Sequence, residues 1–150
     1  MDKSHRNTIF PEQAEILEHQ SHPGQQYIMR VQAPKCAAHA QPGSFAHIQC
    51  DPLLPMRRPI SIMRVSKHAG WVDFLYKVQG EGTRLLAQRQ VGEKIDLLAP
   101  IGHPFKLNPE RNRPLLIGGG VGIPPMIFLA EALHQLGSDW QPLVIMGSEV

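Results

Sequence analysis

The feature that most constrains the fold is an apolar run that breaks at a cluster of glycines and then restarts as a helix. Leu115-Leu116-Ile117 leads directly into Gly118-Gly119-Gly120-Val121-Gly122-Ile123-Pro124-Pro125. A buried strand, a glycine turn and a helix form the first half of a parallel βα unit, whose turn presents backbone N–H groups to a phosphate. The pattern predicts a strand over residues 114–117, a helix over 124–136 that stops at Gly137, and a second buried strand over 143–146.

The glycine turn departs from the strict dinucleotide fingerprint. Gly118 and Gly120 supply the first two glycines of G-x-G-x-x-G, but the third place is Ile123. The order Gly120-x-Gly122-x-x-Pro125 fits a proline-ended loop instead. A tight turn that binds no ligand is the alternative, and three consecutive glycines make it the less favoured one.

The preceding part of the chain consists of short alternating segments separated by turn residues. Strands are expected over residues 14–19, 26–31, 45–50, 60–65, 71–78 and 94–98, with a short helix over 84–90 that Thr83 caps. Regular short strands in a chain with 13 Gly and 14 Pro predict an all-β antiparallel Greek-key barrel.

The change of pattern near Arg111 predicts two domains. We expect the barrel to occupy residues 1–110 and the first βαβ unit of an incomplete α/β nucleotide-binding domain to occupy residues 111–150. Two parallel strands with one helix leave an apolar face and an edge uncovered, whereas parallel sheets are normally covered on both faces. Either more chain normally follows, or another subunit covers this surface.

Composition and charge exclude several classes of function. The net charge is +2 and the densest basic cluster is the pair Arg57-Arg58, which disfavours nucleic-acid binding. Cys36 and Cys50 are the only cysteines, so they cannot form a four-thiolate iron–sulfur site; two free thiols are favoured over a disulfide. The eight histidines show no metal-binding spacing, so no metal site is expected. Residues 1–6 are polar and no apolar run could span a membrane, so we expect a cytoplasmic protein.

Two short motifs inside the predicted barrel could bind a cofactor. Arg58-Pro59-Ile60-Ser61 begins a strand; an arginine can clamp a phosphate through two N–H groups, and a serine can point at a ring heteroatom. Tyr76-Lys77-Val78 ends a strand, and Gly80-Glu81-Gly82-Thr83 then opens a helix whose N–H groups could bind a pyrophosphate. Taken singly, the first motif is better explained as a surface arginine beside a rigid turn than as a cofactor site. For the second motif, an ordinary glycine turn and a cofactor site are about equally favoured.

Taken in order, the three motifs resemble the ferredoxin-reductase superfamily, in which an antiparallel flavin-binding barrel precedes a nicotinamide-nucleotide domain. Pro42-Gly43-Ser44-Phe45 and Asp51-Pro52-Leu53-Leu54 extend the resemblance to the electron-transfer subunits of bacterial dihydroorotate dehydrogenases. The resemblance covers most of residues 9–150, and the ordered set is far more specific than any single motif.

The resemblance implies FAD and NAD(H) as cofactors. Arg58, beside Pro59, would contact the FAD phosphates, Ile60 would pack on the isoalloxazine ring, and Ser61 would lie near its reactive edge as the catalytic residue. The remaining matched positions are Tyr76, Lys77 and Val78 along the ribityl and phosphate region, Gly82 and Thr83 at the pyrophosphate, and Gly118, Gly119, Gly120 and Gly122 at the NAD phosphates.

The implied function is that of an electron-transfer subunit that moves electrons between NAD(H) and a catalytic dehydrogenase subunit in pyrimidine biosynthesis. Family members carry a cysteine cluster near the C-terminus that holds a 2Fe–2S centre, and its ligands are absent from this sequence. We therefore expect this chain alone not to complete electron transfer. Two alternatives stay open: an electron-transfer subunit of a hydrogenase or another multi-subunit reductase, and a non-catalytic binding or assembly module.

Overall fold

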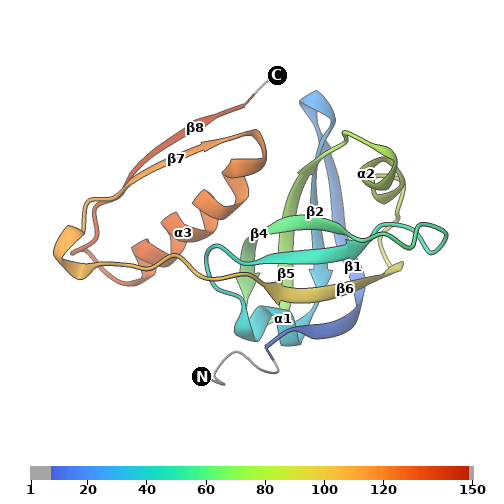
Figure 1. Ribbon diagram of the computed structural model, residues 1–150, viewed down its shortest axis with the longest axis horizontal. Helices are drawn as coiled ribbons and strands as arrows, with labels where there is room; N and C mark the ends of the chain where they lie inside the picture. The colour runs from blue at the N-terminus through green and yellow to red at the C-terminus, as the bar shows by residue number, and fades with distance from the viewer. Residues whose placement is uncertain (1–7, 149–150) are drawn as a thin grey trace.

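The computed structural model describes residues 8–148, in which six antiparallel strands close into a barrel (Figure 1). The strands are β1 (Phe10–His22), β2 (Gln26–Gln32), β3 (Phe45–Gln49), β4 (Arg58–Ser66), β5 (Trp71–Lys77) and β6 (Lys94–Ile101). Their order around the barrel, β1-β2-β5-β4-β3-β6, is a Greek-key arrangement and confirms the predicted fold class.

Strand β1 is longer than the sequence pattern predicts, because both of its ends are paired. Phe10 lies opposite Ala99 of β6, and His22 lies opposite Gln26 of β2. The polar residues at the ends of β1 carry little alternation, so only the pairing partners reveal that the strand continues.

The barrel includes one helix that the sequence analysis missed, α1 (Pro34–His39). The two carboxylate oxygens of Glu12, on β1, accept hydrogen bonds from the backbone N–H groups of Lys35 (3.0 Å) and Cys36 (2.8 Å). This cap comes from more than twenty residues away in the sequence, so no local signal marks the start of the helix.

The prediction that Thr83 caps a helix over residues 84–90 is wrong. Helix α2 (Glu81–Leu86) begins earlier, with Gly80 at the N-cap, so Thr83 is its third residue. The Thr83 Oγ1 accepts hydrogen bonds from the N–H groups of Gln79 (3.0 Å) and Gly80 (3.3 Å). The threonine therefore stabilises the helix start from inside the first turn rather than from the preceding position. Two short 3₁₀ turns, η1 (Pro23–Gln25) and η2 (Pro109–Arg111), complete this part of the chain.

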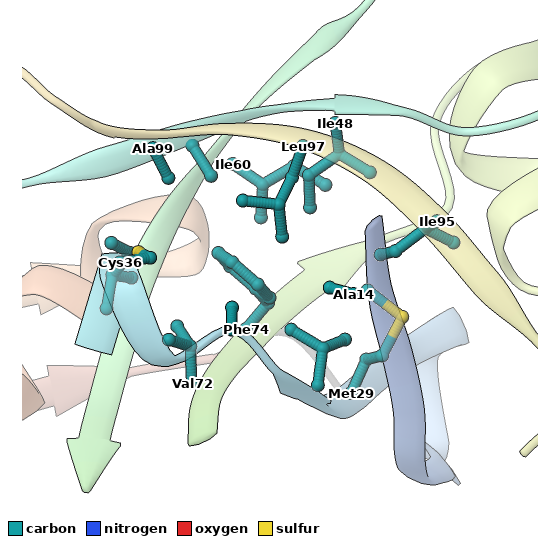
Figure 2. Close-up of a cluster of buried hydrophobic side chains, with 14 of the residues drawn as sticks. Ala14, Met29, Cys36, Ile48, Ile60, Val72, Phe74, Ile95, Leu97 and Ala99 are labelled. Atoms are coloured by element: carbon teal, nitrogen blue, oxygen red, sulfur yellow. The ribbon is translucent and has the colours of Figure 1, made fainter. Parts of the chain in front are cut away.

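The barrel interior is a continuous apolar core. Figure 2 shows Phe74 of β5 with side chains from the surrounding strands and from α1 directed toward the same space. Phe74, Met29, Ile48 and Leu97 are completely buried, as strand alternation predicts for inward-facing positions. Burying each such side chain stabilises the fold by about 1.5–3 kcal/mol.

The remainder of the described chain is a strand–helix–strand unit, which we call the βαβ unit. It comprises β7 (Leu115–Gly119), the 3₁₀ turn η3 (Gly120–Gly122), α3 (Ile123–Gln135) and β8 (Leu143–Gly147). Strands β7 and β8 are parallel, and α3 covers one face of this sheet through a small cluster of Leu116, Leu129 and Leu133. The predicted order of elements is therefore confirmed.

Helix α3 also contacts the barrel, against which it lies in Figure 1. The Phe128 side chain belongs to the barrel core, and the Glu131 Oε1 accepts a hydrogen bond of 2.6 Å from the Arg64 Nε of β4. The helix is thus shared between the two parts of the molecule.

The second face of the β7–β8 sheet is uncovered within the described chain, as the sequence analysis expects. Ile117 is 66% exposed and Ile145 is 51% exposed. The division into domains at residues 110 and 111 stays a prediction, and its outer ends, residues 1–7 and 149–150, lie outside the described residues. No helix among residues 8–148 is long and apolar enough to cross a membrane.

Candidate cofactor site

A cleft of about 590 Å³ lies where the barrel meets the βαβ unit. Its barrel side is formed by residues of β2 and β5 and the segment that follows, and its other side by the ends of β7 and β8 and the η3 turn. The lining residues are Gln26, Leu75, Tyr76, Lys77, Gln79, Gly119, Gly120, Val121, Gly147 and Ser148. The fold therefore brings two of the three predicted motifs to one concave site of the size that binds small ligands.

A hydrogen bond joins the two walls of this cleft. The Gln26 Nε2 of β2 donates to the Ser148 Oγ, which follows β8, over 2.9 Å. The two residues are 122 positions apart in the sequence, so this contact exists only because the barrel and the βαβ unit lie against each other.

The first motif and the helix α2 meet at a second place. A Cβ atom at Gly82 would lie 2.9 Å from the Arg58 Nε and 3.1 Å from the Arg58 Cγ. Only a glycine therefore lets the arginine side chain lie directly against the first turn of α2. The arrangement places a guanidinium beside the start of a helix, which suits a phosphate group.

The two adjacent arginines differ in their partners. The Arg57 Nη2 lies 2.6 Å from the Asp96 Oδ1, so the charge of Arg57 is paired within the protein. The Arg58 Nη1 donates to the backbone carbonyl of Met56 over 3.2 Å, a contact that does not neutralise its charge. Arg58 is therefore the better candidate of the two to bind an anionic group.

The other residues of the first motif lie on β4 but do not line the cleft. Pro59 is exposed and Ser61 is half-buried, whereas Ile60 is 6% exposed and belongs to the barrel core. The burial of Ile60 leaves little of its side chain for a ring to pack on. Val78 also lies outside the cleft lining, directly after β5.

The glycines at the end of β7 and at the start of η3 divide into two groups. Gly119 and Gly120 line the cleft. Gly118 is instead packed inside the βαβ unit, where an added Cβ would lie 2.9 Å from the Met146 Sδ and 3.0 Å from the Gly122 carbonyl oxygen. Gly118 allows close packing of β7 on α3, which is a structural requirement of the turn.

Two aromatic residues and a histidine pack together at the end of the barrel beside the second motif. The Tyr76 side chain is 5% exposed, and its hydroxyl lies 2.7 Å from the His19 Nε2. The Tyr27 ring stacks on the Tyr76 ring, with 5.5 Å between centroids and 15° between planes. Burial raises the pKa of the Tyr76 phenol well above its usual value, so the group stays a neutral hydrogen-bonding hydroxyl.

Sequence reasoning missed His19, because no local pattern connects it with its partners. Tyr76 is 57 positions away, and the other partner, the Arg89 carbonyl, is 70 positions away. Strict alternation from the buried Ala14 and Ile16 would place His19 on the outer face, and only the register shift of β1 between Ile16 and Glu18 changes this, so the sequence carried no signal for it.

The described residues do not provide a metal site. Among residues 8–148, no three His, Cys, Asp or Glu side chains are grouped so that they could hold a metal ion. Cys36 and Cys50 are both free and buried, which confirms the predicted pair of free thiols. Burial raises the pKa of the Cys36 thiol to about 12 and also raises that of Cys50, so neither is disposed to form a thiolate ligand. The residues present do not fit a 2Fe–2S cluster.

The sequence is similar to curated electron-transfer proteins, although no protein-family model matches it. It is 39% identical over 117 residues to the dihydroorotate dehydrogenase B (NAD⁺) electron transfer subunit of Geobacillus thermodenitrificans, covering 74% of this chain and 45% of the relative. It is 43% identical over 103 residues to the subunit of the same name from Bacillus caldolyticus, covering 65% and 39%. The chain therefore spans less than half the length of these relatives.

Solved structures share the fold over nearly the whole chain. The NADH-dependent reduced ferredoxin-NADP oxidoreductase matches with a TM-score of 0.84 and 25% identity, over 93% of this chain and 49% of that one. The ferredoxin reductase of carbazole 1,9a-dioxygenase matches with a TM-score of 0.79 and 25% identity, over 94% and 43%. Phthalate dioxygenase reductase shares the fold at 17% identity, with a TM-score of 0.76 over 95% and 44%. The chain is therefore similar in sequence to the electron transfer subunits of dihydroorotate dehydrogenase B, and it shares the fold of the ferredoxin reductases.

Proposed function

We propose that this chain is the FAD- and NAD(H)-binding part of an electron-transfer subunit that serves a catalytic dehydrogenase subunit of the dihydroorotate dehydrogenase B type. The observation that carries the proposal is the shared cleft, in which Tyr76 and Lys77 of the barrel face Gly119 and Gly120 of the βαβ unit. Hydride transfer between a nicotinamide and a flavin requires the two rings to be held together in one site. The relatives' role as electron transfer subunits supports the same function.

The residues around Gly82 fit a flavin phosphate. The Gly82 backbone leaves room for the Arg58 side chain beside α2, and an arginine can bind a phosphate through two parallel N–H groups. In our proposal Arg58, Gly82 and Thr83 hold the FAD phosphates, and Pro59 fixes the backbone next to Arg58. When bound, the flavin accepts a hydride and releases single electrons, which suits a step between NAD(H) and a one-electron partner.

The remaining predicted positions keep their roles as proposals. Tyr76, Lys77 and Val78 would border the ribityl chain, and Ser61 would lie near the reactive edge of the ring. Gly119 and Gly120 would approach the NAD phosphates, with Gly118 and Gly122 shaping the turn. Ile60 would contact the ring only through the small part of its side chain that is exposed. A 2Fe–2S cluster belongs to the longer relatives in this proposal, not to the described residues.

The test is the visible absorption spectrum of the purified chain after incubation with FAD and removal of the excess. We expect bound flavin in the wild type and weaker binding in Arg58→Ala, since a hydrogen bond to a charged group contributes about 1.5–3 kcal/mol, or roughly tenfold to a hundredfold in affinity. Arg111→Ala is the matched control, because this arginine is exposed in the η2 turn. A colourless wild-type protein, or equal flavin binding in the Arg58 and Arg111 variants, would contradict the proposed site.

One alternative function is favoured by a specific observation. The uncovered apolar face of β7 and β8 suits a non-catalytic assembly module that docks on a partner. Rapid reduction of the bound flavin by NADH in the isolated chain would exclude that alternative.

The other alternative is a different partner enzyme, a hydrogenase or another multi-subunit reductase, in place of the dehydrogenase. Co-purification of the chain with its partner would identify that enzyme. The cytoplasmic location expected from the sequence stays a prediction.

A further inference from the structure

His19 connects two segments that belong to different cofactor motifs. Its side chain, on β1, is half-buried. The Nε2 lies 2.7 Å from the Tyr76 hydroxyl, and the Nδ1 lies 2.9 Å from the carbonyl oxygen of Arg89. Both distances are those of good hydrogen bonds, so both ring nitrogens are engaged.

The two partners assign the tautomer of the neutral imidazole. A backbone carbonyl can only accept a hydrogen bond, so the His19 Nδ1 carries the proton and donates to Arg89. The Nε2 is then an acceptor, and the Tyr76 hydroxyl donates to it. Because the hydroxyl is held neutral by burial, it remains a donor.

Each of these partners is fixed to a motif. Tyr76 is the first residue of Tyr76-Lys77-Val78, at the end of β5 that borders the cleft. Arg89 follows α2, and its N–H donates to the carbonyl of Leu86, the completely buried last residue of that helix. The imidazole therefore joins the end of β5 to the helix whose first turn contains Gly82 and Thr83.

Tyr27 packs against both the His19 and the Tyr76 rings. Its ring stacks on Tyr76 and lies 5.5 Å from the His19 ring. The Tyr76 ring is thus held by stacking, while its hydroxyl is held by His19. The hydrogen bond to His19 links the Tyr76 hydroxyl to the turn after α2, whereas Tyr27 lies on β2.

We propose that His19 is a positioning residue of the flavin site: it fixes α2 relative to the end of β5, so that both motifs are held in place before the cofactor binds. The inference rests on the proposed function, because it assigns these motifs to FAD. A site that is ordered in advance loses less conformational entropy on binding, so its affinity is higher. His19 does not itself line the cleft; it acts through Tyr76, which does, and through the turn after α2.

The first test compares FAD affinity in three variants. His19→Leu removes both hydrogen bonds, whereas His19→Gln keeps an amide that can accept from the Tyr76 hydroxyl. We expect the dissociation constant for FAD to rise about tenfold in His19→Leu and to be partly restored in His19→Gln, as the loss of one or two neutral hydrogen bonds implies. Val72→Ala is the control for a general loss of stability, since Val72 is buried at the other end of β5 and should leave affinity unchanged.

The second test needs no cofactor. Hydrogen exchange of the FAD-free protein, followed by mass spectrometry on peptides covering residues 76–86, reports whether the end of β5 and α2 open together. We expect faster exchange there in His19→Leu than in Val72→Ala. Tyr76→Phe, which keeps the ring and removes only the hydroxyl, should increase exchange at β5 and serves if His19→Leu does not fold.

The outcomes separate this inference from the proposed function. Unchanged exchange over residues 76–86 in the His19 and Tyr76 variants would overturn the inference whether or not FAD binds. Faster exchange with unchanged FAD affinity would overturn it as well. If the wild type binds no FAD, the flavin assignment for this chain is refuted. Faster exchange in the His19 and Tyr76 variants would then still support the connection between the two motifs.

Discussion

The barrel and the βαβ unit bury their apolar residues in different ways. In the barrel, every strand pairs on both sides, and inward-facing residues such as Phe74 and Leu97 are completely buried. In the βαβ unit, only the face of the sheet toward α3 is covered, and Leu115 and Ile117 remain 55% and 66% exposed. A closed sheet has no free edge and encloses its own core, whereas a two-stranded parallel sheet depends on what packs against it.

This difference has a consequence for the candidate site. The cleft has one wall on the barrel and one on the βαβ unit, so its shape depends on how firmly the second wall is held. The described contacts that hold it include Phe128 in the barrel core, the Arg64–Glu131 ion pair and the Gln26–Ser148 hydrogen bond. We therefore expect changes in the barrel to alter global stability, and changes in the βαβ unit to alter mainly the cleft.

The largest effect is expected from Phe74→Ala. This side chain is completely buried in the middle of the barrel core (Figure 2), and truncating a buried phenylalanine typically costs about 3–5 kcal/mol. Urea unfolding followed by circular dichroism measures the loss. A decrease in the free energy of unfolding below about 1 kcal/mol would mean that the barrel core does not dominate stability. The barrel and the βαβ unit would then not differ in the way described above.

A pH effect should act on the barrel alone, because both thiols lie there. Burial raises the pKa of the Cys36 thiol from its ordinary value of 9.0 to about 12. Above pH 9 the unfolded thiol ionises while the folded one stays protonated, so the unfolded state binds fewer protons and stability falls as pH rises. The free energy of unfolding should decrease by about 2 kcal/mol by pH 10.5, at 1.36 kcal/mol per pH unit.

Cys36→Ala isolates this contribution, because Cys50 and Tyr76, whose pKa values are also raised, remain in the variant. Its stability should fall less steeply than that of the wild type between pH 9 and pH 11. Parallel pH profiles for the two proteins would show that the Cys36 thiol does not contribute.

Gly118→Ala should weaken the βαβ unit while leaving the barrel folded. The added Cβ would lie 2.9 Å from the Met146 Sδ and 3.0 Å from a backbone oxygen, and such overpacking costs about 1–3 kcal/mol. Hydrogen exchange in β7, α3 and β8 measures it. Gly122→Ala is the matched control, because no atom beyond its neighbours in the chain lies within 4 Å of a Cβ there. Equal effects of the two substitutions would contradict the packing role of Gly118.

The smallest effect is expected from Ile117→Thr. The side chain lies on the uncovered face of β7, and threonine keeps the β-branched shape that strands favour. Thermal unfolding should show a change within about 0.5 kcal/mol. A loss of several kcal/mol would show that this face is covered in solution, for example by a second molecule, and a lower association state in the variant would identify that contact.

Much of the fold could be predicted because it follows from near neighbours. The alternation of residues 26–31 predicts β2 with Met29 and Val31 inward, and both are completely buried. The run of glycines and prolines after Ile117 predicts the change from strand to helix, although β7 continues to Gly119 rather than ending at residue 117. Helix α1 could not be predicted in this way, because its cap is Glu12, on a distant strand.

The candidate site was predictable only in parts. The motifs around Arg58, Tyr76 and Gly118 stand out in the sequence, and the structure brings Tyr76 beside the turn that follows Gly118. The contact of Arg58 with Gly82 and the bond between His19 and Tyr76 have no sequence signal. Side chains on different strands meet only after the barrel closes, and the order of the strands decides which ones meet.

Hydrophobic period and turn chemistry are local properties of the chain, so the strand–turn–helix pattern, the barrel class and the candidate motifs follow from the sequence alone. Which motifs share a cleft, how tightly Gly118 is packed and which side chains His19 contacts are set by the tertiary structure. Those features depend on contacts between residues up to 122 positions apart. Such contacts form only when burial of the common core offsets the conformational entropy lost in bringing distant segments together.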